Sequence, residues 1–126
     1  IIYPESHYGR DALVGVALFL SLLAERKIAV STLRASYPSY FMSKKKIDLN
    51  PTIDVDAILV AMESKYAHEQ ISTIDGVKID FPNEWVHLRK SNTEPIIRIY
   101  TEAPTQDTAD ELADKIINEI KEVVGL

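Results

Sequence analysis

The chain contains no cysteine among its 126 residues. A disulfide-bonded scaffold, a cysteine nucleophile and a metal site built on thiolates are therefore excluded. The absence also fits a reducing compartment, and we expect a cytoplasmic protein. The first residue is Ile1 rather than Met, so we expect a processed or cloned piece of a longer protein.

Long hydrophobic runs and an excess of basic charge are missing as well. The most apolar window, residues 12–24, spans 13 residues, whereas a helix that crosses a bilayer needs about 20. The window follows a polar start rather than a basic leader, so we expect a buried helix and neither a membrane anchor nor a signal peptide. The formal net charge of −5 argues against a nucleic-acid partner.

No group of residues typical of a metal site is visible in the sequence. Asp54 and Asp56 offer two carboxylates, but they stand where a helix is expected to begin, and acidic residues there cap the helix and favour its dipole. His87 precedes Arg89 by two residues and therefore points to the same side of a strand. It can approach a ligand of Arg89 or lie half buried in a sheet. We expect no metal ligand in this chain.

Hydrophobic periodicity predicts three helices and one weaker helical turn. Residues 10–26 are apolar nearly all round, which is typical of a helix covered on several sides, and the weaker turn covers 31–36. A second helix, capped by Thr52 or Asp54, and a last helix that begins near 105–108 each carry one apolar stripe. The residues expected to be buried in these stripes are Val55, Ile58, Leu59, Met62 and Tyr66, and Leu112, Ala113, Ile116, Ile117, Ile120, Val123 and Val124.

The remaining segments have the pattern of β-strands. The expected strands are 44–49, 70–74, 77–81, 85–90 and 96–102, with residues 37–43 as a linker. The three lysines of the first strand are expected to form a solvated face at a sheet edge. Asp75 and Gly76 favour a tight hairpin turn with positive φ angles. This order of elements predicts a two-layer α+β domain over 43–126, an antiparallel sheet with both helices on one face.

Residues 89–98 gather anion-binding groups around one short connection between two expected strands. Arg89 and Arg98 offer guanidinium forks that match phosphate oxygens two at a time. Ser91, Asn92 and Thr93 add neutral donors at short reach. Two like charges on one loop repel each other unless an anion lies between them. From residue types alone, phosphate binding and a polar hairpin connection remain equally open.

These residues also carry a family resemblance. Arg-x-Ser-Asn-Thr-Glu-Pro at 89–95, followed by Arg98, resembles the phosphate-binding loop in the C-terminal domain of the α-D-phosphohexomutases, the phosphoglucomutase/phosphomannomutase family. The resemblance extends outward over 85–88 and 99–103, and 8–15 is similar to part of the family's third domain. It implies a TATA-binding-protein-like arrangement for 43–126. Residues 1–42 would then be the tail of a preceding α/β domain and a linker.

The resemblance implies the C-terminal part of an enzyme that moves phosphate between the 1 and 6 positions of a hexose such as glucose or mannose. The residues that it assigns to the phosphate that is not transferred are Arg89, Ser91, Asn92, Thr93 and Arg98. Glu94 would pair with an arginine or fix the loop. The family's magnesium loop and phosphoserine loop are absent, so we expect Mg²⁺ to bind in other domains of the enzyme and no catalysis by this chain alone. A phosphoglucosamine mutase and a stand-alone α+β binding module are the alternatives.

Overall fold

The computed structural model describes every residue except 51, 92 and 126 and divides the chain into two compact units, Ile1–Pro38 and Ser39–Leu126. The first unit holds helix α1 (Ala12–Arg26) and the short helix α2 (Val30–Ala35), which confirms the two expected helical segments. Among the described residues, no helix combines the length and the apolar character that a membrane span requires.

Helix α1 is apolar along most of its length, yet none of its residues is buried. It begins after Asp11, whose side chain accepts a hydrogen bond from the backbone N–H of Val14 at 3.0 Å. Leu13 and Leu20 are exposed over more than half of their surface. The prediction of a buried helix is therefore wrong within this chain, where a helix with the apolar pattern of one that packs inside a larger domain has little cover. The assignment of residues 1–42 to a preceding α/β domain stays a prediction.

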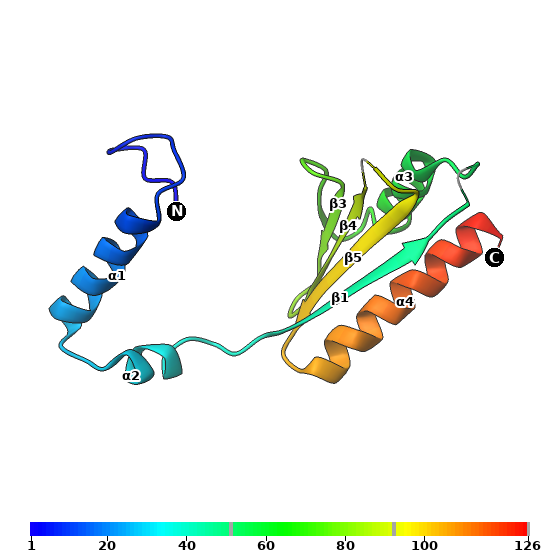
Figure 1. Ribbon diagram of the computed structural model, residues 1–126. Helices are drawn as coiled ribbons and strands as arrows, with labels where there is room; N and C mark the ends of the chain where they lie inside the picture. Colours follow the sequence, from blue (N-terminus) through cyan, green and yellow to red (C-terminus); the bar gives the residue numbers. More distant parts are fainter. Residues whose placement is uncertain (51, 92, 126) are drawn as a thin grey trace. The chain divides into compact units, whose positions relative to one another are not determined.

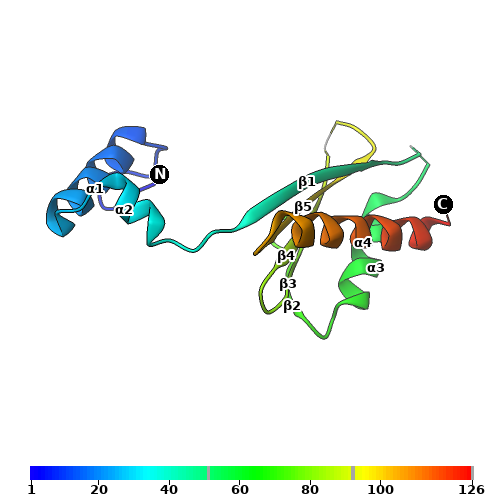
Figure 2. The ribbon, with the colours of Figure 1, turned by 90° about the horizontal axis from the view of Figure 1, so that it is seen from below.

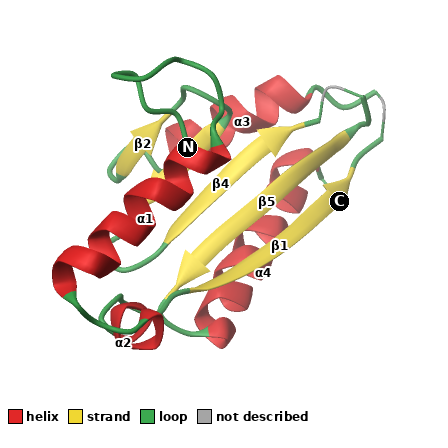
Figure 3. Cartoon of the chain, turned by 60° about the vertical axis from the view of Figure 1, so that its left-hand side comes forward, coloured by secondary structure: helices red, strands yellow, loops and turns green. Residues whose placement is uncertain are grey.

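The second unit is built on an antiparallel sheet, which in the described part of the chain has five strands in the order β1-β5-β4-β3-β2 (Figures 1 and 3). The strands are β1 (Phe41–Asp48), β2 (Gln70–Ser72), β3 (Val77–Asp80), β4 (Trp85–Lys90) and β5 (Ile96–Ala103). Strand β1 lies at an edge, as expected, but it begins at Phe41, inside the segment that the sequence predicts as a linker. The sheet thus extends a little further toward the N-terminus than its alternating pattern indicates.

Helices α3 (Val55–Lys65) and α4 (Gln106–Val124) cover one face of this sheet (Figures 2 and 3). Helix α4 packs on β1 and β5, while α3 packs on β3, β4 and α4. The core between the two layers includes Ile58, Met62, Ile79, Val86, Leu88, Ile97, Ile99, Ile116 and Ile120, each at most 2% exposed. The predicted two-layer α+β fold is therefore confirmed, and among the described residues of this unit no helix covers the opposite face of the sheet.

The helix starts and most of the buried stripes agree with the sequence prediction. Asp54 caps α3 by accepting from the backbone N–H of Asp56 at 3.0 Å. Thr105 and Thr108 form a reciprocal capping box at the start of α4. The prediction that Val123 is buried is wrong. Its side chain is 46% exposed, although it lies on the same side of the helix as the buried stripe. Val124, one residue further along, is still partly buried against the core, so the cover at this end of the helix lies to one side of the stripe.

The β2–β3 connection forms the predicted hairpin but not the predicted turn. Ser72 pairs with Lys78, so the connection is longer than the two residues of a primed turn. Gly76 has a φ of 76°, whereas Asp75 is not among the described non-glycine residues with positive φ. Only the glycine takes the left-handed conformation, and the connection therefore follows a different path from a tight Asp-Gly turn.

A partly buried hydrogen bond ties strand β1 to helix α4. Ser43 is 4% exposed and donates to Asp110 Oδ1 at 2.5 Å. This bond is the main reason why the pKa of Asp110 lies below its usual value of 3.8, with a further hydrogen bond from Gln106. A carboxyl group with a lowered pKa stabilises the fold above its unfolded pKa, and the stabilisation is lost as the pH falls through the folded pKa.

Ser43→Ala is therefore expected to lower the free energy of unfolding most at pH 7, and the loss should shrink as the pH falls below 3.8 and through the lowered pKa of Asp110 in the folded protein. Urea unfolding at pH 7 and at a series of acidic pH values measures the change. Asp110→Asn is the control, because in that background the effect of Ser43→Ala should no longer depend on pH. A loss that stays constant as the pH falls in the wild-type background would contradict the assignment.

Candidate functional site

The alternation of side chains along β4 separates the predicted site from the core. Val86 and Leu88 are fully buried under the helices. His87 and Arg89, which alternate with them, project from the opposite face, here called the open face. Lys90 projects toward the helix side, where its ammonium group contacts Asp56 Oδ1 of α3 at 2.7 Å. Arg89 and Lys90 thus lie on different faces of the sheet.

The open face brings the two predicted arginines together. Arg89 of β4 and Arg98 of β5 are direct partners across the strand pair. Arg98 is in turn the partner of Lys46 on β1, and the exposure pattern of β1 places Lys46 on the same face. Three neighbouring strands therefore contribute one cation each to a single row. Like charges directly opposite each other destabilise a sheet, so the row favours a bound anion.

The connection between β4 and β5 begins beside these arginines. Ser91 donates its backbone N–H to the carbonyl of Ile96 at 3.1 Å, and its side-chain oxygen accepts from the backbone N–H of Thr93 at 3.4 Å. The two hydroxyl oxygens of Ser91 and Thr93 are 3.4 Å apart. Asn92 was also predicted to bind phosphate, and it lies outside the described residues. The loop therefore places two hydroxyl groups close together next to the paired arginines.

Glu94 takes part in the loop through its backbone rather than through an arginine. Its carbonyl accepts the backbone N–H of Ile96 at 2.8 Å. Among the ion pairs of the described residues, none joins Glu94 to an arginine. Its charge acts on Lys46, whose pKa is raised mainly by the hydrogen bond and charge of Asp48 and to a smaller extent by Glu94. Of the two predicted roles, the geometry favours fixing the loop.

Arg89 has an acidic partner that the sequence did not indicate. Its Nη2 atom lies 2.9 Å from Oδ2 of Asp75, in the β2–β3 connection. His87, which also projects from the open face of β4, donates from Nε2 to the backbone carbonyl of Asp75 at 2.5 Å. His87 therefore supports the connection beside the arginine and does not stand free to meet a ligand.

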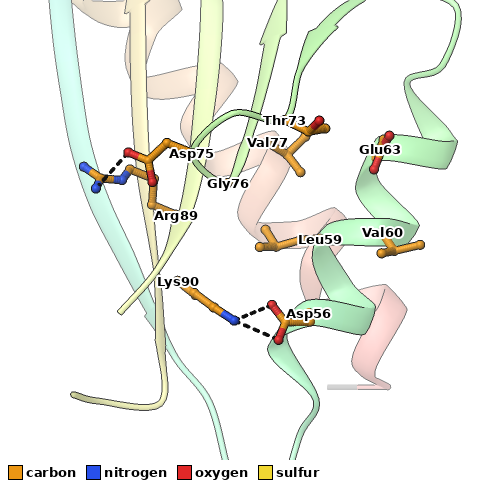
Figure 4. Close-up of a pocket in the computed structure, with 10 residues that line it drawn as sticks. All are labelled: Asp56, Leu59, Val60, Glu63, Thr73, Asp75, Gly76, Val77, Arg89 and Lys90. Atoms are coloured by element: carbon orange, nitrogen blue, oxygen red, sulfur yellow. Dashed lines mark hydrogen bonds and ion pairs between the residues drawn. The ribbon is translucent and has the colours of Figure 1, made fainter. Parts of the chain in front are cut away.

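An open pocket of about 340 Å³ lies between α3 and the β2–β3 connection (Figure 4). Leu59 and Val60 of α3 form one wall, and Thr73 lies across from them. In Figure 4, Lys90 points toward Asp56 at the edge of this pocket, while the Arg89 guanidinium turns away from it toward Asp75. Arg89 and Asp75 are themselves among the residues that line the pocket, so the pocket adjoins the paired arginines although the Arg89 guanidinium does not point into it.

The described residues include no grouping of three or more side chains suited to hold a metal ion. Asp54 and Asp56, the acidic pair at the start of α3, both have protein partners. Asp54 caps the helix and Asp56 forms an ion pair with Lys90. The expectation that Mg²⁺ binds in other domains of the enzyme stays a prediction.

Comparison with known proteins gives a family match over most of the second unit. The family described as "Phosphoglucomutase/phosphomannomutase, C-terminal domain" matches residues 43–119. A phosphoglucosamine/phosphogalactosamine mutase from Sulfurisphaera tokodaii is 38% identical over 125 residues, and the match covers 98% of this chain and 27% of that protein. A phosphoglucomutase/phosphomannomutase from Thermococcus kodakarensis is 32% identical over 124 residues, with the same coverage.

The fold has a solved relative as well. A phosphoglucomutase/phosphomannomutase family protein from Burkholderia thailandensis superposes with a TM-score of 0.54 at 21% identity. The superposition covers 76% of this chain and 20% of that structure. At this identity the likeness concerns the fold alone. The chain spans about a quarter of the length of the curated relatives that it matches.

Proposed function

The chain belongs to the phosphoglucomutase/phosphomannomutase family as its C-terminal domain, and from this premise we propose that it binds a phosphate group of a hexose phosphate between the open face of the sheet and the 91–95 loop. The residues assigned to this site are Arg89, Ser91, Asn92, Thr93 and Arg98. Asn92 is included on the resemblance of its motif alone.

The observation that carries the proposal is the pairing of Arg89 with Arg98 across two strands of the open face. A phosphate dianion placed between two guanidinium groups removes their mutual repulsion and accepts charge-assisted hydrogen bonds from both. The hydroxyl groups of Ser91 and Thr93, held together in the adjacent loop, supply further donors. An apolar molecule would gain nothing from this arrangement, whereas a small anion gains from every group in it.

In the full-length enzyme, the site would hold the phosphate that is not being transferred during 1,6-phosphoryl transfer. Binding energy from this remote group would position the far hydroxyl of the sugar for reaction, which raises the rate as well as the affinity. Mg²⁺ and the reacting phosphoserine are assigned to other domains on the family resemblance alone. A cytoplasmic location remains part of this proposal.

The sugar belongs to one of two candidate classes, amino sugars or neutral hexoses. One relative at 38% identity is named a phosphoglucosamine/phosphogalactosamine mutase and one at 32% a probable phosphoglucosamine mutase, while another at 32% is named a phosphoglucomutase/phosphomannomutase. A hexose 6-phosphate is the common element. The phosphate site does not contact the group at carbon 2 of the sugar. Selectivity between these sugars would therefore come from other domains of the enzyme.

The test is a titration of the ¹⁵N-labelled chain with glucose 6-phosphate, followed by amide NMR. We expect the shifts to centre on Arg89, Ser91, Thr93 and Arg98, with a dissociation constant of about 1 mM, or roughly −4 kcal/mol, since the domains that close over the sugar are missing. Glucose at the same concentration is the control for the sugar ring. Shifts centred elsewhere, or shifts of equal size with glucose, would reject the site.

A further inference from the structure

The β2–β3 connection lies unusually close to strand β4. A Cβ atom added to Gly76 would come within 2.1 Å of the carbonyl oxygen of Leu88 and 3.2 Å of the Cα atom of Arg89. Glycine also provides the φ of 76° at this position. The absence of a side chain at residue 76 therefore lets the connection approach the backbone of β4 beside Arg89.

This approach places Asp75 within reach of two open-face side chains of β4. His87 holds its backbone carbonyl, and Arg89 contacts its carboxylate at 2.9 Å. The contact with Arg89 is drawn in Figure 4. The carboxylate is 60% exposed and the guanidinium 43% exposed, so both stay accessible to a dissolved ion.

We propose that Asp75 is the counter-carboxylate of the phosphate site, which neutralises Arg89 while the site is empty and lowers the affinity for phosphate. The inference rests on the proposed phosphate site at Arg89. In the free protein, Arg89 faces Arg98 directly, and the carboxylate offsets part of their repulsion. A bound phosphate would offset the same repulsion. The phosphate and the Asp75 carboxylate therefore compete for the guanidinium group of Arg89.

The competition predicts the direction in which Asp75 changes the affinity for phosphate. A phosphate near Arg89 is attracted by the guanidinium group, but it is either repelled by the carboxylate of Asp75 or has to displace that carboxylate into water. Removal of this charge should therefore strengthen binding. Because the pair is exposed, we expect about a two- to fivefold decrease in the dissociation constant, the range of a surface ion pair. For the enzyme, a site held partly neutral by its own carboxylate releases its phosphate more readily.

The experiment compares Asp75→Asn with Asp80→Asn. Both substitutions remove one negative charge, and Asp80 lies on the open face in contact with Lys78, away from Arg89. Inorganic phosphate is titrated into the full chain at constant ionic strength, and the dissociation constant is measured by amide NMR. Urea unfolding of each variant establishes that the fold is intact.

We expect Asp75→Asn to bind phosphate more tightly than the wild type and Asp80→Asn to match the wild type. A distorted connection would weaken binding, so tighter binding separates the proposed role from a structural one. Unchanged or weaker binding by Asp75→Asn would overturn the inference while leaving the phosphate site in place, and so would equal tightening by Asp80→Asn. If the wild type binds no phosphate at the loop, the proposed function fails and the inference fails with it.

Discussion

Replacement of Arg89 by alanine in the full-length mutase is expected to lower kcat/KM by about one to two orders of magnitude. Its guanidinium lies on the open face opposite Arg98, and alanine leaves no donor for the phosphate oxygens. A lost charge-assisted contact is worth roughly 1.5–3 kcal/mol, which corresponds to that loss of transition-state stabilisation. Steady-state kinetics with glucose 1-phosphate measures it.

Lys90→Ala is the matched control for Arg89→Ala. Lys90 is the next residue along β4 and carries the same charge, but its ammonium group contacts Asp56 on the helix side of the sheet. Its replacement should leave kcat/KM within about threefold of the wild type, as is usual for an exposed ion pair. A larger loss for Lys90→Ala than for Arg89→Ala would show that phosphate binds on the other face.

The opposite facing of Arg89 and Lys90 could be predicted from the sequence, because alternation along a strand depends only on local geometry. The pairing of Arg89 with Arg98 was implicit in two strands joined by a short loop. Lys46 could not be placed beside them. Its neighbourhood depends on the pairing of β1 with β5, two strands with residues 49–95 between them. Sequence periodicity does not reveal which strands become neighbours.

The contact between Asp75 and Arg89 was beyond sequence reasoning for a different reason. An Asp-Gly pair between two β-like segments favours a primed turn, and such a turn would carry Asp75 at the tip of a hairpin. The actual connection keeps positive φ only at Gly76 and lies against the backbone of β4. This path depends on the close packing of two backbones, a tertiary feature that leaves no signal in a local pattern.

The buried stripe of α4 shows which buried residues the apolar periodicity predicts correctly and which it does not. Ala109, Leu112, Ala113, Ile116 and Ile120 are buried, while Val123, on the same side of the helix, is 46% exposed. The period of 3.6 residues fixes the direction of an apolar stripe. It does not say which side of the stripe keeps its cover in the last turn, where Val124 still packs against the core beside the exposed Val123.

Ile116→Ala is expected to cost about 2–5 kcal/mol of unfolding free energy, because Ile116 is fully buried in the core between helix and sheet and its loss leaves a cavity. Val123→Ala tests the same side of the same helix without a cavity, and we expect a change within about 0.5 kcal/mol. Both substitutions replace a β-branched residue by alanine, so they raise the intrinsic helix propensity by similar amounts. Urea unfolding of the two variants measures the difference. A loss of similar size for both would mean that Val123 is covered in the folded protein, and the boundary drawn here for the core would be wrong.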